Sequence, residues 1–297
     1  MRKGLVSVVV GLVAVAAAGC SGGTGDAAEV GTTGSAATAT TFPYLALGDS
    51  IAFGDDGYVS WTDPARKDAA NFVGYPFQVA QTLYGSSAKV YDLACPGETT
   101  GSFSDASAPD NGCREYRFTD QDQLHESYSG TQQAAALAFL AAHPETKLVS
   151  ITLGGNDLLL AEYACQAASN FYTCVVESIP GVLATAAKNV GAIIDTIRGS
   201  GYRGDIVYLT QYATSYTDAT QLAAIPAFNT AVGAAVIAHG GKVVSGFDTF
   251  AAASVFYGGD PCKAGLLIPN PDGSATCDKH PSTKGRNLLA EAVVLGH

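Results

Sequence analysis

Four short segments of the sequence carry the residue types that nucleophilic catalysis uses. Three of them stand at the ends of short apolar runs and the fourth lies near the C-terminus; their central residues are Ser50, Gly97, Asn156 and His280. A serine hydroxyl is a poor nucleophile until a base takes its proton, and histidine is the side chain best suited to this near neutral pH. Ser50 and His280 are therefore a candidate nucleophile and base. The structural alternatives are a helix N-cap for Ser50 and a surface position for His280.

The elements that must position these residues alternate along the chain from Phe42 onward. Continuous apolar runs of strand length, which suit strands buried on both faces, are Tyr44–Leu47, Lys89–Leu93, Leu148–Leu153, Asp205–Leu209 and Lys242–Val244. Segments with helical spacing are Tyr75–Tyr84, Thr131–His143, Pro180–Arg198, Ala219–His239 and Thr283–Leu295. This β-α-β order predicts a parallel sheet with helices on both faces. In such sheets active sites gather at the carboxyl ends of the strands, where these motifs stand.

The four segments, in this order, resemble the sequence blocks of the SGNH, or GDSL, hydrolase family, and in particular its secreted, actinobacterial-type esterases and lipases with three disulfides. The matching residues are Gly48-Asp49-Ser50, Gly97, Gly154-Gly155-Asn156-Asp157 and His280. The resemblance covers about Phe42 to the C-terminus. It implies a flavodoxin-like three-layer α/β/α sandwich. It also implies an enzyme that cleaves esters, thioesters or acyl groups on lipids and sugars without a cofactor or a metal.

The resemblance also assigns roles to the matching residues. The backbone N–H groups of Ser50 and Gly97 and the side chain of Asn156 would form the oxyanion hole, which stabilises the negative charge that develops on a carbonyl oxygen under attack. Asp49 and Asp157 are expected to order their turns by accepting hydrogen bonds from backbone amides.

The acid that would orient the histidine departs from the family pattern. The family usually has DxxH, but Cys277 stands three residues before His280 and the acid, Asp278, only two before. Two alternatives follow: Asp278 reaches the imidazole, or a backbone carbonyl near Cys277 orients it in a Ser–His dyad. Asp278 is therefore a third catalytic candidate, ranked below His280.

The N-terminus has the layout of an export signal. Arg2 and Lys3 precede an apolar run, and Ala17-Ala18-Gly19-Cys20 resembles a bacterial lipobox, so we expect a signal peptide over residues 1–19 and a lipid on Cys20. A plain signal peptide with an incidental cysteine is the alternative. Residues 20–41 are small and polar, which predicts a flexible tether. Residues 42–297 then form one hydrolase domain. This domain is expected either on the outer face of a bacterial membrane or secreted from the cell.

The other six cysteines are an even number in a chain predicted to be exported, which favours disulfides. Six cysteines allow fifteen connectivities, but these fall into three pairs that are local in sequence: Cys95–Cys113, Cys165–Cys174 and Cys262–Cys277. A metal site is the alternative, although none of the spacings is CxxC.

Composition and rival motifs narrow the function further. Charged residues are 14% and hydrophobic residues 47% of 297, with a net charge of −11, which indicates a globular protein that does not bind nucleic acid. No Walker loop, HExxH pair or Rossmann fingerprint is present. We expect a monomer that acts on a small-molecule or lipid ester.

Three alternatives to a lipid esterase stay open: a carbohydrate deacetylase, a phospholipase, and a catalytically idle surface-binding lipoprotein on the same scaffold. The segment Ala161–Val176, with three aromatic side chains, is either a wall of an acyl pocket or a packed surface excursion.

Overall fold

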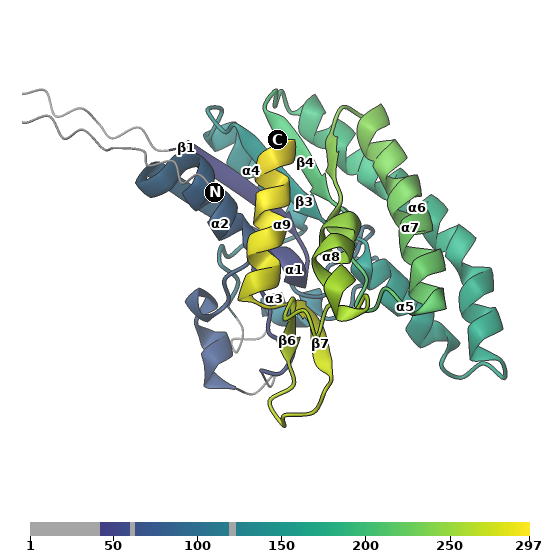
Figure 1. Ribbon diagram of the computed structural model, residues 1–297. Coiled ribbons are helices and arrows are strands. Elements are labelled where there is room, and N and C mark those ends of the chain that lie inside the picture. Colours follow the sequence, from purple (N-terminus) through teal and green to yellow (C-terminus); the bar gives the residue numbers. More distant parts are fainter. Residues whose placement is uncertain (1–41, 60–62, 119–122) are drawn as a thin grey trace, which may run out of the picture. The chain divides into compact units, whose positions relative to one another are not determined.

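A computed structural model of the protein describes residues 42–59, 63–118 and 123–297 (Figure 1). The expected signal peptide, the tether and Cys20 lie outside the described residues. The central sheet consists of β1 (Phe42–Gly48), β2 (Ala88–Asp92), β3 (Leu148–Thr152), β4 (Asp205–Leu209) and β5 (Lys242–Val244). The ends of each strand lie within two residues of a predicted apolar run. The match follows for β1, β3 and β4 from burial on both faces, which makes a strand continuously apolar.

All neighbouring strands of this sheet are parallel, in the order β2-β1-β3-β4-β5. The order is that of flavodoxin-like sheets, and it reverses direction between β1 and β3. Ligand sites of open α/β sheets lie at such a reversal, outside the carboxyl ends of the strands. The predicted fold class is therefore confirmed, and β1 and β3 deliver Ser50 and Asn156 to that edge.

Helices cover both faces of the sheet. They are α1 (Ser50–Phe53), α2 (Tyr75–Tyr84), α3 (Cys113–Phe118), α4 (Gln132–Ala142), α5 (Gly155–Cys165), α6 (Phe171–Gly199), α7 (Ala219–Ala238), α8 (Gly246–Ser254) and α9 (Thr283–Gly296). Short 3₁₀ turns are Pro64–Lys67, Ala69–Asn71, Gly85–Ser87 and Val255–Tyr257.

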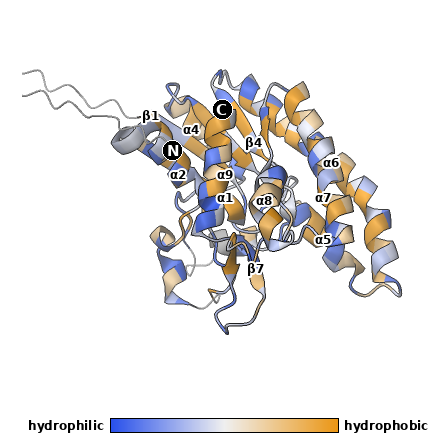
Figure 2. Cartoon of the chain, viewed as in Figure 1, coloured by the Kyte–Doolittle hydropathy of each residue, from blue (hydrophilic) through white to orange (hydrophobic). Residues whose placement is uncertain are grey.

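Two hydrophobic cores separate the three layers. Alternate residues of β1 point to opposite faces, so that Tyr44 and Ala46 pack in one core and Leu45 and Leu47 in the other. The first core includes buried residues of α1, α2, α8 and α9, and the second includes those of α4, α6 and α7. Figure 2 shows hydrophobic residues in β4 and mixed hydrophobic and hydrophilic residues along α6.

Helix α6 differs from its predicted extent, because it begins at Phe171 and not at Pro180. The Asn170 side chain accepts a hydrogen bond from Thr173 N (3.0 Å) and caps the helix there. Pro180 consequently lies inside the helix and not in its first turn. Helices α5 and α8 were not predicted; each begins within three residues of a strand end, where no separate apolar period marks the start.

Helix α7 is, among the described residues, the one helix long and apolar enough to cross a membrane. Its residues Phe228, Val232 and Val236 are buried in the second core. Its apolar character therefore reflects, at least on this face, packing within the α/β fold.

A second, two-stranded sheet lies outside the central one. Strands β6 (Leu267–Pro269) and β7 (Cys277–Pro281) form an antiparallel hairpin directly before α9. All three predicted cysteine pairs form disulfides, and the pair Cys262–Cys277 attaches the start of β7 to the segment before β6. The hairpin carries the Asp278 and His280 segment toward the carboxyl edge of the central sheet.

Candidate active site

Ser50 and His280 lie in direct contact. The Ser50 Oγ atom is 2.9 Å from His280 Nε2, and both residues are buried. Ser50 is the first residue of α1, immediately after the turn that follows β1. The N-cap of α1 is Asp49, whose Oδ1 accepts a hydrogen bond from Ile51 N (3.0 Å). The Ser50 hydroxyl is thus not the cap, and it faces a ring nitrogen that can accept its proton.

Asp278 lies on the other side of the imidazole. Its Oδ1 atom contacts His280 Nδ1 and also accepts a hydrogen bond from the His280 backbone N–H (2.9 Å). Residues two apart on a strand point to the same face, so β7 places Asp278 and His280 side by side, whereas Cys277 points to the opposite face. This geometry favours the carboxylate over the backbone carbonyl as the group that orients the ring.

The charge state of Asp278 suits this contact. Burial raises the pKa of Asp278, but the hydrogen bonds from His280 and its charge outweigh burial and lower that pKa to about 2. The carboxylate is therefore ionised at neutral pH. An ionised carboxylate at Nδ1 holds the Nδ1–H tautomer, which leaves Nε2 free to accept the serine proton.

Neighbouring groups fix the backbone around this pair. The Tyr212 hydroxyl donates a hydrogen bond to Lys279 O (2.7 Å), between Asp278 and His280. Gly57 lies against the Asp278 carboxylate so closely that a Cβ atom at this position would overlap it. The acid is therefore held by the hairpin on one side and by the loop after α1 on the other.

Gly97 and Asn156 lie together on a second side of the site. Gly97 adopts a positive φ of 86°, and an added Cβ would overlap the backbone of Asn111, so this turn requires glycine. Asn156, in the first turn of α5, is buried and donates from Nδ2 to Glu98 O (3.0 Å). The backbone N–H groups of Ser50 and Gly97 have no hydrogen-bond acceptor among the described residues.

The two aspartates of the motifs order their turns, as expected. Asp157 accepts hydrogen bonds from Thr100 N (2.9 Å) and Thr100 Oγ1 (2.6 Å), which ties α5 to the turn after Gly97. Burial raises the pKa of Asp157, and it raises the pKa of Asp49 to about 7. Both carboxyls are engaged by groups of the protein, Asp49 by Ile51 N and Asp157 by Thr100.

Two buried polar residues, Gln132 and Glu98, join the turn at Gly48 to the turn at Gly97. The sequence did not identify either as part of the site. Gln132 accepts a hydrogen bond from Gly48 N (2.6 Å) and donates to Gly48 O (2.9 Å) and Glu98 Oε2 (3.1 Å). Glu98 Oε1 accepts from Ser102 Oγ (2.5 Å). Gln132 lies 84 residues from Gly48, so no local signal in the sequence could have identified this link.

A cavity of about 680 Å³ adjoins the second side of the site. Its lining includes Thr99, Asp157, Leu160, Val182 and Asn189. The segment Ala161–Val176 contributes nothing to this lining, and Tyr163, Phe171 and Tyr172 in it are exposed. Of the two predicted alternatives for this segment, the surface excursion agrees with the structure.

One cluster of described residues has metal-ligand types within reach of one another, namely Cys95, Glu98 and Cys113. Both cysteines belong to the disulfide Cys95–Cys113. A disulfide sulfur is not the thiolate that metal ions require, so the cluster does not fit a metal site.

The comparison with known families agrees with the fold and the motifs. The chain belongs to the GDSL-like Lipase/Acylhydrolase family, whose model matches residues 46–287. It is accordingly a carboxylic ester hydrolase of the esterase and lipase type. No curated protein is significantly similar to it.

Solved structures share the fold at low sequence identity. A protein of Parabacteroides merdae described as a GDSL-like lipase has a TM-score of 0.53 and 18% identity, covering 86% of this chain and 95% of its own. A lipase from a goat rumen metagenome has a TM-score of 0.52 and 16% identity, covering 85% and 95%. An extracellular lipase of Streptomyces rimosus has a TM-score of 0.49 and 19% identity, covering 85% and 100%. The first two similarities support the fold assignment.

Proposed function

We propose that Ser50, His280 and Asp278 are the catalytic residues of a serine esterase that hydrolyses carboxylic esters with apolar acyl groups. The observation that carries the proposal is the continuous contact from Asp278 through the imidazole of His280 to Ser50 Oγ. A hydroxyl in this position can be deprotonated as it attacks, and the ionised Asp278 stabilises the imidazolium that forms.

The reaction proceeds in two halves. His280 Nε2 takes the Ser50 proton while Oγ bonds to the ester carbonyl carbon, and the same proton then passes to the departing alcohol. Water attacks the resulting acyl-serine in the second half, with His280 again as base, and releases the carboxylic acid. In both halves the carbonyl oxygen carries negative charge, which the N–H groups of Ser50 and Gly97 and the Asn156 amide would stabilise.

The acyl part of the substrate is inferred from the cavity next to Asn156. Leu160, Val182 and Ala108 contribute apolar surface to its lining, beside polar side chains such as Asp105 and Asn189. The apolar part of the lining favours a hydrocarbon chain. Lipid esters are therefore the proposed substrate class. A phospholipase or a carbohydrate deacetylase would show itself in the substrate profile.

We further propose that the protein is exported and that a lipid on Cys20 holds it on the outer face of the bacterial membrane. Three disulfides support an oxidising compartment. Cys20→Ala should release the protein from the membrane fraction into the medium. Equal retention of both proteins on membranes would contradict the anchor.

The test of the catalytic proposal compares the wild type with Ser50→Ala on p-nitrophenyl esters from acetyl to palmitoyl. Loss of at least about 10³-fold in kcat is expected from removal of the nucleophile, with the wild type favouring the longer chains. Ser107→Ala, an exposed serine of the Cys95–Cys113 loop, is the matched control. Unchanged hydrolysis by Ser50→Ala would contradict the proposal.

A further inference from the structure

Asn111 contacts two of the proposed oxyanion-hole residues at once. Its backbone N–H donates to Gly97 O (2.8 Å), and its side-chain Nδ2 donates to Asn156 Oδ1 (2.9 Å). Asn156 lies 45 residues further along the chain, at the start of α5. The half-buried residue Asn111 therefore joins the turn that contains Gly97 to the side-chain amide of Asn156.

These contacts determine which way the Asn156 amide faces. Its Oδ1 accepts from Asn111, and its Nδ2 donates to Glu98 O, an atom that can only accept. If the amide turned by half a rotation, Oδ1 would oppose the Glu98 carbonyl and Nδ2 would oppose Asn111 Nδ2. The observed orientation keeps the second hydrogen of Asn156 Nδ2 available for another acceptor.

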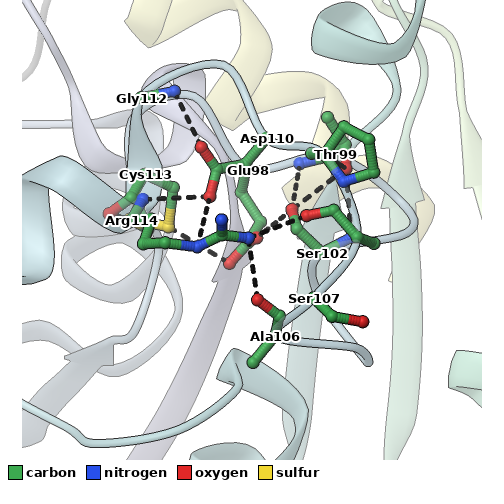
Figure 3. Close-up of polar contacts among 12 residues, drawn as sticks. Glu98, Thr99, Ser102, Ala106, Ser107, Asp110, Gly112, Cys113 and Arg114 are labelled. Atoms are coloured by element: carbon green, nitrogen blue, oxygen red, sulfur yellow. Dashed lines mark hydrogen bonds and ion pairs between the residues drawn. A yellow bond between two sulfur atoms is a disulfide. The ribbon is translucent and has the colours of Figure 1, made fainter.

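The loop that carries Asn111 is held from several directions. Asp110 accepts hydrogen bonds from Gly112 N (3.0 Å) and Arg114 N (3.1 Å), as Figure 3 shows. The Arg114 guanidinium donates to the carbonyls of Ala106 (2.7 Å) and Ala108 (2.9 Å). The disulfide Cys95–Cys113 closes the loop two residues after Asn111. The side chain of Asn111 thus projects from a constrained backbone.

We propose that Asn111 is a positioning residue of the reaction: it orients the Asn156 amide so that Nδ2 donates to the oxyanion. The inference rests on the proposed function and adds to it a residue that the four family motifs do not contain. Asn111 acts through Asn156 and does not itself touch the substrate. Without Asn111, the Glu98 carbonyl would be the remaining described contact that holds the Asn156 amide in this orientation.

Two substitutions of Asn111 separate this role from a packing role. Asn111→Ala removes the donor, and we expect kcat to fall about 10-fold, less than the roughly 10²- to 10³-fold loss on removing an oxyanion donor itself. Asn111→Asp has nearly the same shape but only accepts, so it draws Asn156 Nδ2 toward itself and turns Oδ1 toward the substrate. We expect this variant to lose about 100-fold or more in kcat. KM should change little in both variants.

If Asn111 had only a packing role, Asn111→Ala would lose more activity than Asn111→Asp, because aspartate fills the space of asparagine and alanine does not. The pH profile adds a second readout. A protonated aspartic acid can donate to Asn156 Oδ1 again, so the activity of Asn111→Asp relative to wild type should rise as the pH falls. A greater loss in Asn111→Ala than in Asn111→Asp, with no such rise, would overturn the proposal.

The decisive measurement is a double-mutant cycle on p-nitrophenyl acetate with Asn156→Ala. Without the Asn156 amide there is nothing for Asn111 to orient, so Asn111→Asp should lower kcat by less than about 2-fold in that background. An equal loss in both backgrounds would contradict the proposal. Thermal unfolding of every variant verifies folding, and Ser107→Ala in the same loop is the control expected to match wild type.

Failure of the proposed function gives a different pattern. If Ser50→Ala and Asn156→Ala both keep wild-type kcat, the site assignment itself is wrong. If both lose activity while Asn111→Asp keeps it, only the role of Asn111 is wrong.

Discussion

The Nε2 atom of His280 lies 2.9 Å from the Oγ atom of Ser50, although 230 residues separate the two in the chain. They come from different parts of the fold. Ser50 begins α1 at the carboxyl end of a central strand, whereas His280 belongs to the β6–β7 hairpin outside the central sheet. The proposed chemistry therefore depends on how firmly the hairpin is held against the sheet edge.

The contact between Asp278 and His280 predicts a triad and not a dyad. Asp278→Asn keeps the shape of the side chain but removes the charge and favours the other imidazole tautomer. We expect kcat to fall about 10³- to 10⁴-fold with little change in KM. Asp272→Asn, in the exposed turn of the hairpin, is the matched control. Activity of Asp278→Asn within about tenfold of wild type would indicate that a backbone carbonyl orients the ring.

Gly57 tests whether the position of Asp278 matters as well as its charge. Gly57→Ala should displace the carboxylate, because the new Cβ would overlap it. We expect kcat to fall about 10-fold or more, since small misplacements of catalytic groups are costly, and thermal stability to change much less. Gly199→Ala, where an added Cβ meets open space at the end of α6, should keep full activity. Wild-type kinetics in Gly57→Ala would show that Asp278 tolerates displacement.

A buried ion pair holds the loop that contains Gly57. Arg66 Nη1 lies 3.1 Å from Asp55 Oδ1, both side chains are buried, and Arg66 Nη2 also donates to Val59 O (2.7 Å). Arg66→Met leaves Asp55 with an uncompensated buried charge, so the free energy of unfolding should fall by about 3–5 kcal/mol in urea titrations. Lys242→Met breaks an exposed pair with Asp205 and should cost less than about 1 kcal/mol. Equal effects of the two substitutions would refute this account.

Asp92, at the end of β2, predicts a pH dependence of stability. Burial raises the pKa of Asp92 to about 8, and Oδ2 has no hydrogen-bond partner among the described residues. The folded protein keeps this proton up to about pH 8, whereas the unfolded chain releases it near pH 4. The carboxyl therefore lowers the free energy of unfolding as the pH rises between these values.

Asp92→Asn removes that dependence. Relative to wild type, its free energy of unfolding should rise by up to about 1.4 kcal/mol per pH unit between about pH 4 and pH 8. Denaturant titrations at several pH values measure this difference. Glu177→Gln, on the exposed side of α6, is the matched control. A flat difference for Asp92→Asn would mean that this carboxyl is ionised in the folded protein.

The central sheet was predictable because β1, β3 and β4 are buried on both faces and read as continuous apolar runs. The edge strands β2 and β5 are partly exposed, but their apolar residues still marked them. The hairpin was not, because β6 has three residues and β7 consists of Cys277–Pro281, with little apolar pattern. Helix α6 was predicted too short because Pro180 resembled a first-turn proline, while the true start depends on the Asn170 cap.

The sequence identified the candidate site residues that stand in short motifs, but not those whose contacts join distant segments. Ser50, Gly97, Asn156 and His280 were recognisable because each stands in a motif of a few residues. The contact between Asp278 and the His280 imidazole could not be predicted without knowing that β7 is a strand. The two-residue period of a strand turns both side chains to one face. Gln132 and Asn111 were not identified, because their contacts with Gly48 and Asn156 join segments far apart in the sequence.

Covalent labelling tests the central claim most directly. A p-nitrophenyl phosphonate ester reacts with an activated serine and leaves a stable adduct that imitates the tetrahedral intermediate. Peptide mass spectrometry should place one adduct on Ser50, with loss of esterase activity in proportion to labelling, and none in His280→Ala. Full labelling at another residue, or hydrolysis that persists when Ser50 is labelled, would contradict the assignment of Ser50 as the nucleophile.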